Sequence, residues 1–240
     1  MTLYAIAGLE AVRGDGPHRF RLAVPRLTIA RGARLALTGP SGCGKSTLLD
    51  ILALLAAPAR ARLFSFAPRA GAAAVDLRRG SAGSAVLARL RGRHLGYVPQ
   101  VGGLLPALSV RRNVALPRRL LGLPDDGSVE ALLERLGLAR HADKLPGALS
   151  VGERQRAAIA RALAHGPDVI AADEPTAALD PYASDAVMAA FVEAADAAGC
   201  TLLIVSHDLD RVDRFGLEPV PQRFASLADG TVVSVFGEAA

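Results

Sequence analysis

The fold is decided by the stretch Gly39-Pro40-Ser41-Gly42-Cys43-Gly44-Lys45-Ser46-Thr47, which has the form G-x-x-x-x-G-K-S-T. An apolar run at 34–38 comes before it, and the apolar residues of 48–52 repeat at helical spacing after it. The order is therefore strand, glycine loop and helix. An ordinary glycine-rich turn before a core helix is the alternative, and it is disfavoured because both the spacing and the strand-to-helix context match a phosphate-binding loop.

Each part of this loop has a chemical task toward a nucleoside triphosphate. Glycines lack a Cβ, so successive backbone N–H groups of 39–47 can curl around phosphate oxygens, and the positive end of the following helix adds to the attraction. Lys45 is expected to reach the β- and γ-phosphates. The Ser46 hydroxyl is expected to ligate Mg²⁺ between them.

Length and composition predict a folded protein with a sizeable core. The chain has 240 residues, 51% of them hydrophobic. No apolar run reaches about 18 residues, so the chain is not expected to cross a membrane by itself. The N-terminal residues 1–6 lack the basic region and cleavage site of a signal peptide. With Cys43 and Cys200 as its only cysteines, the chain is expected in a reducing cytoplasm.

Positive charge is concentrated between residues 56 and 93. The segment contains eight arginines and a single acidic residue, Asp76. Such a patch could meet anionic lipid, an acidic partner or nucleic acid. Because only Phe64 and Phe66 interleave with the arginines, a stacking platform for single-stranded nucleic acid is poorly supported. A solvated arginine- and alanine-rich surface is the favoured interpretation.

Strands of the buried type alternate with helices through most of the chain. Short runs at 95–98, 168–172 (apolar after its first residue) and 201–205 are each followed closely by polar residues, and helical patterns lie between them. This alternation predicts a mostly parallel sheet with functional loops at the carboxyl ends of its strands.

Two further parts complete the predicted α/β fold of the P-loop NTPase type. Alternating residues at 3–12 and 18–24 predict an N-terminal antiparallel β layer. Residues 101–165 are mostly helical, with breaks at Gly and Pro, and predict an inserted α-helical subdomain. We therefore expect a single domain over 1–240, divided into an ATPase core at 1–100 and 166–240 and a helical subdomain at 101–165.

Polar residues follow two consecutive buried-type strands. Asp173 is expected to be a second Mg²⁺ ligand, and Glu174 to accept a proton from the attacking water. His207 is expected to hydrogen-bond the γ-phosphate and place that water. Any one of these residues alone would usually be structural, but their recurrence after consecutive strands favours a catalytic site.

A second candidate anion site begins at Ser150. Ser150 and Glu153 have the S-x-x-E spacing of a capping box, which predicts a helix N-terminus there. The small residues around Gly152 would leave this helix end open to an anion.

Taken together, these motifs resemble those of the ATP-binding-cassette (ABC) ATPases, over about residues 19–210. Six motifs follow the order of that family. They are Walker A at 39–47, a Q-loop at Gln100, the signature at 149–155, Walker B at 169–173 with Glu174, a D-loop at 178–180 and an H-loop at His207.

The resemblance implies a head-to-tail dimer in which Walker A of one subunit and the signature of the other enclose each ATP. By this resemblance, Ser150 and Gly152 would contact the γ-phosphate across the interface, and Asp180 would couple the two nucleotide sites. Gln100 would join Mg²⁺ and the attacking water to the helical subdomain. Lys45, Gln100, Glu174 and His207 are thus the expected catalytic residues.

The segment 104–114 resembles the corresponding part of lipoprotein-release, macrolide-export and cell-division ABC ATPases, where it lines the groove that receives a helix of the permease. Val151 departs from the common glycine of the signature. No aromatic residue aligns clearly with the adenine-stacking position, and Phe20 is the nearest candidate.

The expected function is that of the ATP-hydrolysing subunit of an ABC transporter. The implied partners are a membrane permease and a second ATPase subunit, either identical or paralogous, and the implied location is the cytoplasmic face of the cell membrane. Two alternatives stay open: an ATPase that drives a non-transporting membrane regulator, and a soluble ABC ATPase acting on nucleic acid, although no direct contact with nucleic acid is expected.

Overall fold

The structure is a computed structural model that describes residues 1–14, 20–68, 73–78, 82–100, 102–226 and 231–238. The described elements are, in chain order, β1 (Thr2–Arg13), β2 (Phe20–Ala30), β3 (Arg34–Leu37), α1 (Lys45–Leu52), β4 (Leu63–Phe66), β5 (Val75–Asp76), α2 (Ser84–His94), β6 (Leu95–Val98), α3 (Val110–Leu120), α4 (Ser128–Arg135), η2 (Ala139–His141), η3 (Pro146–Ala148), α5 (Val151–Leu163), β7 (Val169–Asp173), α6 (Pro181–Ala197), β8 (Thr201–Val205), α7 (Leu209–Arg214), β9 (Glu218–Pro219), β10 (Gln222–Ser226) and β11 (Val232–Phe236).

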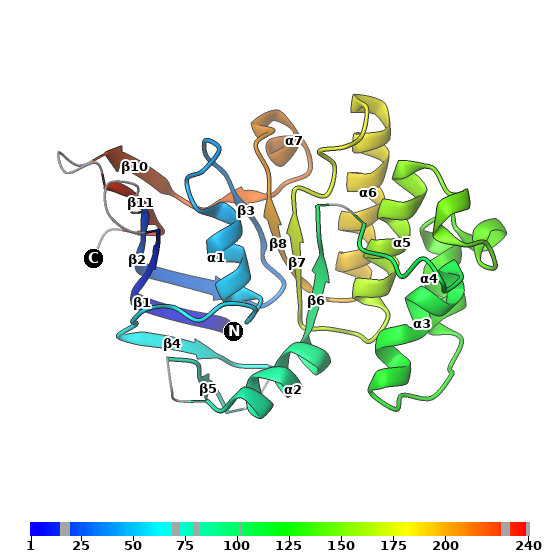
Figure 1. The fold of residues 1–240 in the computed structure, drawn as a ribbon, viewed down its shortest axis with the longest axis horizontal. Helices are drawn as coiled ribbons and strands as arrows, with labels where there is room; N and C mark the ends of the chain where they lie inside the picture. Colours follow the sequence, from blue (N-terminus) through cyan, green and yellow to red (C-terminus); the bar gives the residue numbers. More distant parts are fainter. Residues whose placement is uncertain (15–19, 69–72, 79–81, 101, 227–230, 239–240) are drawn as a thin grey trace.

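A parallel sheet in the order β6-β7-β8-β3-β9 forms the centre of the molecule, as the alternation of strands and helices predicted (Figure 1). Its central strands β7 and β8 are buried apolar runs because both faces of the sheet are covered there. The register pairs Val205 with Leu37 on one side and with Asp173 on the other. β3, β7 and β8 therefore end level, and the loops that follow them lie along one edge of the sheet.

A second sheet, in the order β10-β11-β2-β1-β4-β5, lies beside the parallel one. β1 and β2 pair antiparallel along most of their length, which confirms the predicted N-terminal β layer. The predicted start of the second strand, at residue 18, lies outside the described residues. α1 lies between the two sheets (Figure 1), and its Leu48, Ile51 and Leu52 are fully buried among side chains from both.

The arginine-rich segment contains regular structure that its composition did not reveal. β4 pairs with β1 and buries Phe64 and Phe66, and α2 follows it. Arg60 forms an ion pair with Glu10, and Arg78 forms one with Asp76. These two arginines are therefore engaged within the chain, whereas Arg69 and Arg79 lie outside the described residues.

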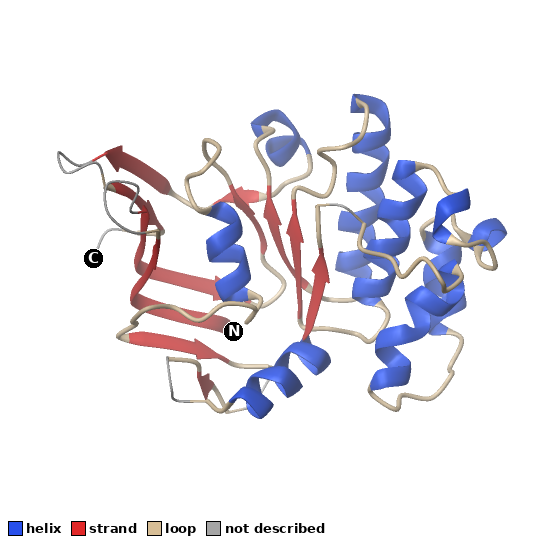
Figure 2. Ribbon diagram, in the orientation of Figure 1, coloured by secondary structure: helices blue, strands red, loops and turns tan. Residues whose placement is uncertain are grey.

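The helices α5 and α6 cover the opposite face of the parallel sheet from α1, and α3 and α4 pack on the outer side of these two helices (Figure 2). Residues 157–160 of α5 are completely buried, and the three alanines among them let the helix approach the sheet closely. The contact with β6 is so close that a Cβ on Gly96 would collide with the carbonyl oxygen of Ala162. Because α1 packs on one face of the sheet and α5 on the other, the sheet separates these two helices.

Within the described parts of the chain, no helix combines the length and the apolar character that crossing a bilayer demands.

Candidate active site

The phosphate loop joins β3 to α1 and has a backbone that favours glycine. Gly39, Gly42 and Gly44 have positive φ angles of 130°, 77° and 90°, a region that residues with a Cβ rarely adopt. Gly44 also lies against Phe20 of β2, and a Cβ there would overlap the aromatic ring. Gly44 therefore meets two requirements at once, one conformational and one steric.

The Lys45 side chain is held inside the phosphate loop by two hydrogen bonds. Its Nζ donates hydrogen bonds to the carbonyl oxygens of Gly39 and Pro40, both at 2.9 Å. The residue is 6% exposed, so its ammonium group depends on these two carbonyls for its polar contacts. A phosphate in the loop would offer the ammonium a full negative charge in place of carbonyl dipoles.

Ser46 and Asp173 meet across the mouth of the loop. The Ser46 hydroxyl donates to Asp173 Oδ1 at 3.1 Å. Burial raises the pKa of Asp173 above its usual range; the hydrogen bond from Ser46 opposes this rise, and the nearby Glu174 carboxylate adds to it. The Ser46 hydroxyl and the Asp173 carboxylate thus face each other. Because burial disfavours the ionised carboxylate, a bound cation would stabilise it there.

Glu174 is the centre of a cluster that joins three loops. Its φ angle of 44° is positive, which is unusual for a residue with a side chain, and its backbone N–H donates to the carbonyl of Val205 at 3.1 Å. Oε1 lies 3.5 Å from His207 Nδ1, and Gln100 Nε2 lies 3.4 Å from Oε2. The structure therefore brings together Gln100, Glu174 and His207, beside Asp173.

The capping box predicted at Ser150 is confirmed. Ser150 Oγ accepts from the backbone N–H of Glu153 at 3.2 Å, while Glu153 Oε2 accepts from the N–H of Ser150 at 2.8 Å. The hydrogen bond from Ser150 N–H is the main reason that the pKa of Glu153 is lowered. His141 was not predicted to take part in this site. Its Nε2 lies 3.0 Å from Glu153 Oε1 and helps to hold the Glu153 side chain in the capping box.

The signature helix does not reach the phosphate loop of its own chain. α5 and α1 pack on opposite faces of the sheet, and within the described residues no hydrogen bond or ion pair joins Ser150 or Gly152 to residues 39–47. A Cβ added to Gly152 would lie nearest to the side chain of Leu179, in the loop before α6. The chain alone therefore presents two separate candidate anion sites.

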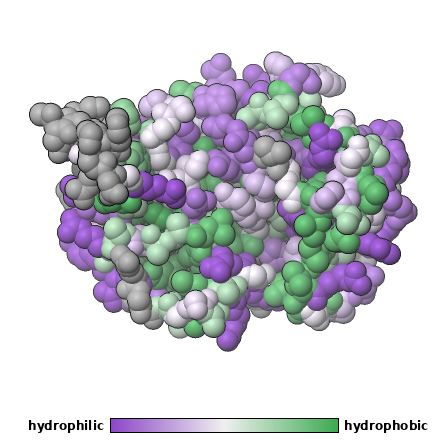
Figure 3. All heavy atoms as spheres, viewed as in Figure 1, coloured by the Kyte–Doolittle hydropathy of each residue, from purple (hydrophilic) through white to green (hydrophobic). Residues whose placement is uncertain are grey.

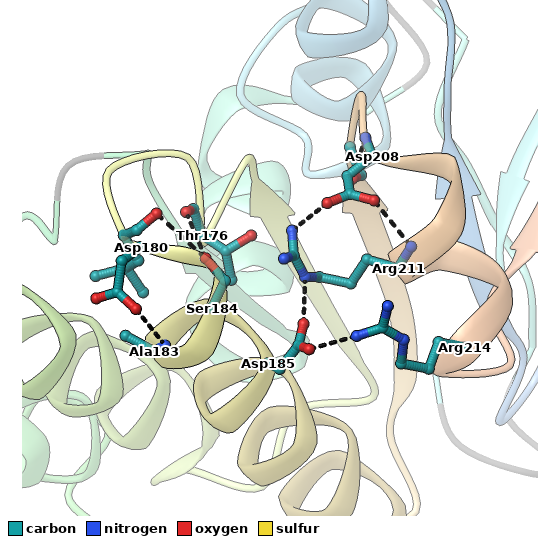
Figure 4. Close-up of polar contacts among 10 residues, drawn as sticks. Thr176, Asp180, Ala183, Ser184, Asp185, Asp208, Arg211 and Arg214 are labelled. Atoms are coloured by element: carbon teal, nitrogen blue, oxygen red, sulfur yellow. Dashed lines mark hydrogen bonds and ion pairs between the residues drawn. The ribbon is translucent and has the colours of Figure 1, made fainter.

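Asp180 caps α6, and a charged network lies beside it (Figure 4). Asp180 Oδ1 accepts from the N–H of Ala183 at 2.9 Å. The network consists of Asp185, Asp208, Arg211 and Arg214, joined by ion pairs. Sequence reasoning missed Asp185 and Arg211. The only local signal was the i, i+3 spacing of Asp208 and Arg211 at the start of α7.

Comparison with known proteins gives a consistent result. The family model described as ABC transporter matches residues 22–177. A lipoprotein-releasing system ATP-binding protein, LolD, from Paramagnetospirillum magneticum is 40% identical over 212 residues, covering 87% of each chain. The macrolide export ATP-binding/permease protein MacB 1 from Aeromonas hydrophila is 41% identical over 97% of this chain but only 34% of its own length.

Solved structures agree with these sequence relatives. The dimeric structure of the bacterial ABC transporter cassette MJ0796 has a TM-score of 0.76 and 29% identity, with 96% of both chains covered. A post-hydrolysis dimer of the same cassette, bound to ADP and Pi, has a TM-score of 0.75 and the same identity and coverage. From the motifs, the fold and these similarities we conclude that the chain belongs to the ABC transporter family and is an ATP-binding, ATP-hydrolysing cassette.

Proposed function

We propose that this ATPase completes its catalytic site only when two subunits meet, and that it drives a membrane permease from the cytoplasmic face of the membrane. The observation that carries the first part is the separation of α1 from α5 by the parallel sheet. A triphosphate bound at 39–47 is out of reach of Ser150 in the same chain. A second subunit arranged head to tail would supply Ser150 and Gly152 to it, with Asp180 close to the junction.

The phosphate loop holds the triphosphate in this proposal. Backbone N–H groups of 39–47 bind the phosphates, and Lys45 exchanges its two carbonyl contacts for phosphate oxygens. Mg²⁺ fits the site, since the Ser46 hydroxyl and the Asp173 carboxylate are oxygen donors of the kind that this ion takes together with substrate phosphates. Ser46, Asp173 and Gln100 would hold it, and it would neutralise charge on the phosphates.

Glu174 is the proposed general base for the attacking water. A proton from the water moves to a Glu174 carboxylate oxygen, the water oxygen bonds to the γ-phosphorus, and the bond to the β–γ bridging oxygen breaks. His207 and Gln100 contact the same carboxylate. They are therefore placed to fix both the base and the water, and their approach from separate loops supports the assignment.

Residues 101–165 act in this proposal as the helical signature subdomain between the core at 1–100 and 166–240. They carry the signature on α5 and border a groove of about 420 Å³ with β6. The groove is lined largely by apolar residues, and Leu120 beside it is 80% exposed. Figure 3 shows hydrophobic surface at the lower right, over the position of α3 in Figure 1. An apolar helix face of a permease would fit this groove.

The dependence of ATPase rate on subunit concentration tests the two-subunit site. Specific activity should rise with concentration of the purified chain and then reach a plateau, and Ser150→Ala should lower the plateau while leaving ATP binding intact. A specific activity that stays constant on dilution would contradict the proposal. For the permease, Leu120→Glu should reduce recovery of membrane proteins with the tagged chain, compared with an exposed control such as Leu145→Glu.

A further inference from the structure

Two loops of the active site are attached to neighbouring residues of α6. The first residue is Ser184, which is 2% exposed. Its Oγ lies within hydrogen-bond distance of the carbonyl oxygens of Thr176, at 3.3 Å, and Leu179, at 3.4 Å (Figure 4). Ser184 therefore fixes the turn that leads from Glu174 to Asp180.

The second residue, Asp185, faces α7, the helix that begins just after His207. Its Oδ1 accepts a hydrogen bond from Arg211 Nε at 2.9 Å, and its Oδ2 accepts one from Arg214 Nη1. Both arginines belong to α7, the helix that follows His207 (Figure 4). One turn of α6 therefore contacts both the turn that follows Glu174 and the helix that follows His207.

Arg211 continues the connection to the residue next to His207. Its Nη1 donates to Asp208 Oδ2 at 2.5 Å, and its backbone N–H donates to Asp208 Oδ1 at 2.9 Å. The N–H of Asp208 in turn donates to Ser206 Oγ at 3.1 Å. Asp208 is thus fixed through both carboxylate oxygens and its backbone, so its position is closely determined.

His207 itself has little to hold it in place. Its side chain is 66% exposed, and its one ion-pair contact within the described residues is the 3.5 Å approach to Glu174. The position of its ring therefore depends on the backbone on either side. That backbone is held by Asp208, and Asp208 is held by Arg211.

The shape and the burial of the Arg211 side chain suit it to holding Asp208 in place. Its side chain is 13% exposed, so the ion pairs it forms are screened less than those on the open surface. A guanidinium presents several N–H donors in one rigid plane and can bind two carboxylates at once. Arg211 uses this property to link Asp185 and Asp208, which lie on different elements.

We propose that Arg211 is a positioning residue for ATP hydrolysis, which keeps His207 aligned with Glu174 and ties that alignment to α6. The proposal rests on the catalytic role proposed above for His207. Arg211 lines a cavity of about 210 Å³ together with Glu174 and His207. Its polar contacts go to Asp185 and Asp208, so it acts through them and not on the substrate.

The experiment compares Arg211→Met with the matched control Arg214→Met, which removes a second, 58% exposed arginine from the same Asp185. Steady-state ATPase kinetics are measured on the full chain at concentrations on the activity plateau. Arg211→Met should lower kcat by about tenfold or more and change KM by less than about twofold, because misplacement of a catalytic group acts on the reaction more than on binding. Arg214→Met should stay within about twofold of wild type in both.

A double-mutant cycle with His207→Ala separates positioning from general stabilisation. If Arg211 acts through His207, Arg211→Met should have little further effect on kcat in the His207→Ala background. An equal loss in both backgrounds, or an Arg211→Met variant no slower than Arg214→Met, would overturn the proposal. Wild-type activity of His207→Ala would instead refute the role of His207, a different failure.

Arg211→Lys keeps the experiment informative if Arg211→Met does not fold. The ammonium keeps the charge, but it lacks the planar fork that bridges two carboxylates. This variant should melt close to wild type and have a kcat between those of wild type and His207→Ala. A fully wild-type kcat would show that the bridge is not required.

Discussion

Glu174 Oε1 and His207 Nδ1 lie 3.5 Å apart although the two residues follow different strands. The strand register explains why these side chains lie close together. Asp173 at the end of β7 pairs with Val205 at the end of β8, so the two strands leave the sheet at the same level. The positive φ of Glu174 then turns its side chain within reach of both His207 and Gln100.

Glu174→Gln should separate ATP binding from hydrolysis. The amide has nearly the shape of the carboxylate but cannot take up the proton of the attacking water, so turnover should fall by about 100-fold or more. ATP should still bind, and sedimentation should show a dimer that persists with ATP and dissociates without it. Hydrolysis at the wild-type rate would disprove the assignment of the base.

Lys45→Ala should weaken ATP binding itself. The change removes a positive charge that is held among carbonyl groups of the phosphate loop. Titration with a fluorescent ATP analogue should show at least about a tenfold loss of affinity, as expected for a lost charge-assisted contact. Lys144→Ala, at an exposed site, is the matched control and should bind as wild type does.

Gly44→Ala should cost more stability than an alanine at an unobstructed glycine with positive φ. Gly122→Ala isolates the conformational cost, about 1–2 kcal/mol, because its φ is 64° and no atom lies within 4 Å of the added Cβ. Gly44→Ala adds an overlap with Phe20. The free energy of unfolding in urea should fall more for Gly44→Ala than for Gly122→Ala. Combining Gly44→Ala with Phe20→Ala should recover part of the difference between the two losses. Equal losses for the two glycines would contradict the steric argument.

Stability should fall as the pH drops from about 6.5 to 4. Burial lowers the pKa of His165 to about 4, because the folded protein disfavours the charged imidazole. Between these values the unfolded chain takes up a proton that the folded chain does not, so protonation favours unfolding. His165→Gln should flatten the pH dependence of the urea midpoint over this range, whereas His207→Gln, at an exposed site, serves as control. An unchanged slope in His165→Gln would show that other groups dominate.

The parts of the fold that were predictable are those with local patterns. A glycine loop between a strand and a helix, and polar residues at strand ends, are read directly from neighbouring residues. Parallel pairing then places Asp173, Glu174 and His207 along one edge of the sheet. The antiparallel layer was predictable in the same way, from the alternation of apolar and polar residues along its strands.

The parts that could not be predicted depend on contacts between distant residues. Arg211 and Asp185 are joined across two elements, and nothing in the sequence around either residue indicates its partner. The same holds for His141 beside Glu153. In the arginine-rich segment, alanine and arginine obscured the short strand whose Phe64 and Phe66 are buried against β1.

The sheet that separates α1 from α5 also has a genetic consequence. If each working site needs a phosphate loop from one copy and a signature from another, a damaged copy also spoils a site of its normal partner. If the work of the dimer needs both of its sites, a Glu174→Gln copy disables every dimer that it forms with a normal copy, and the defect is expected to be dominant when both copies are made together in one cell.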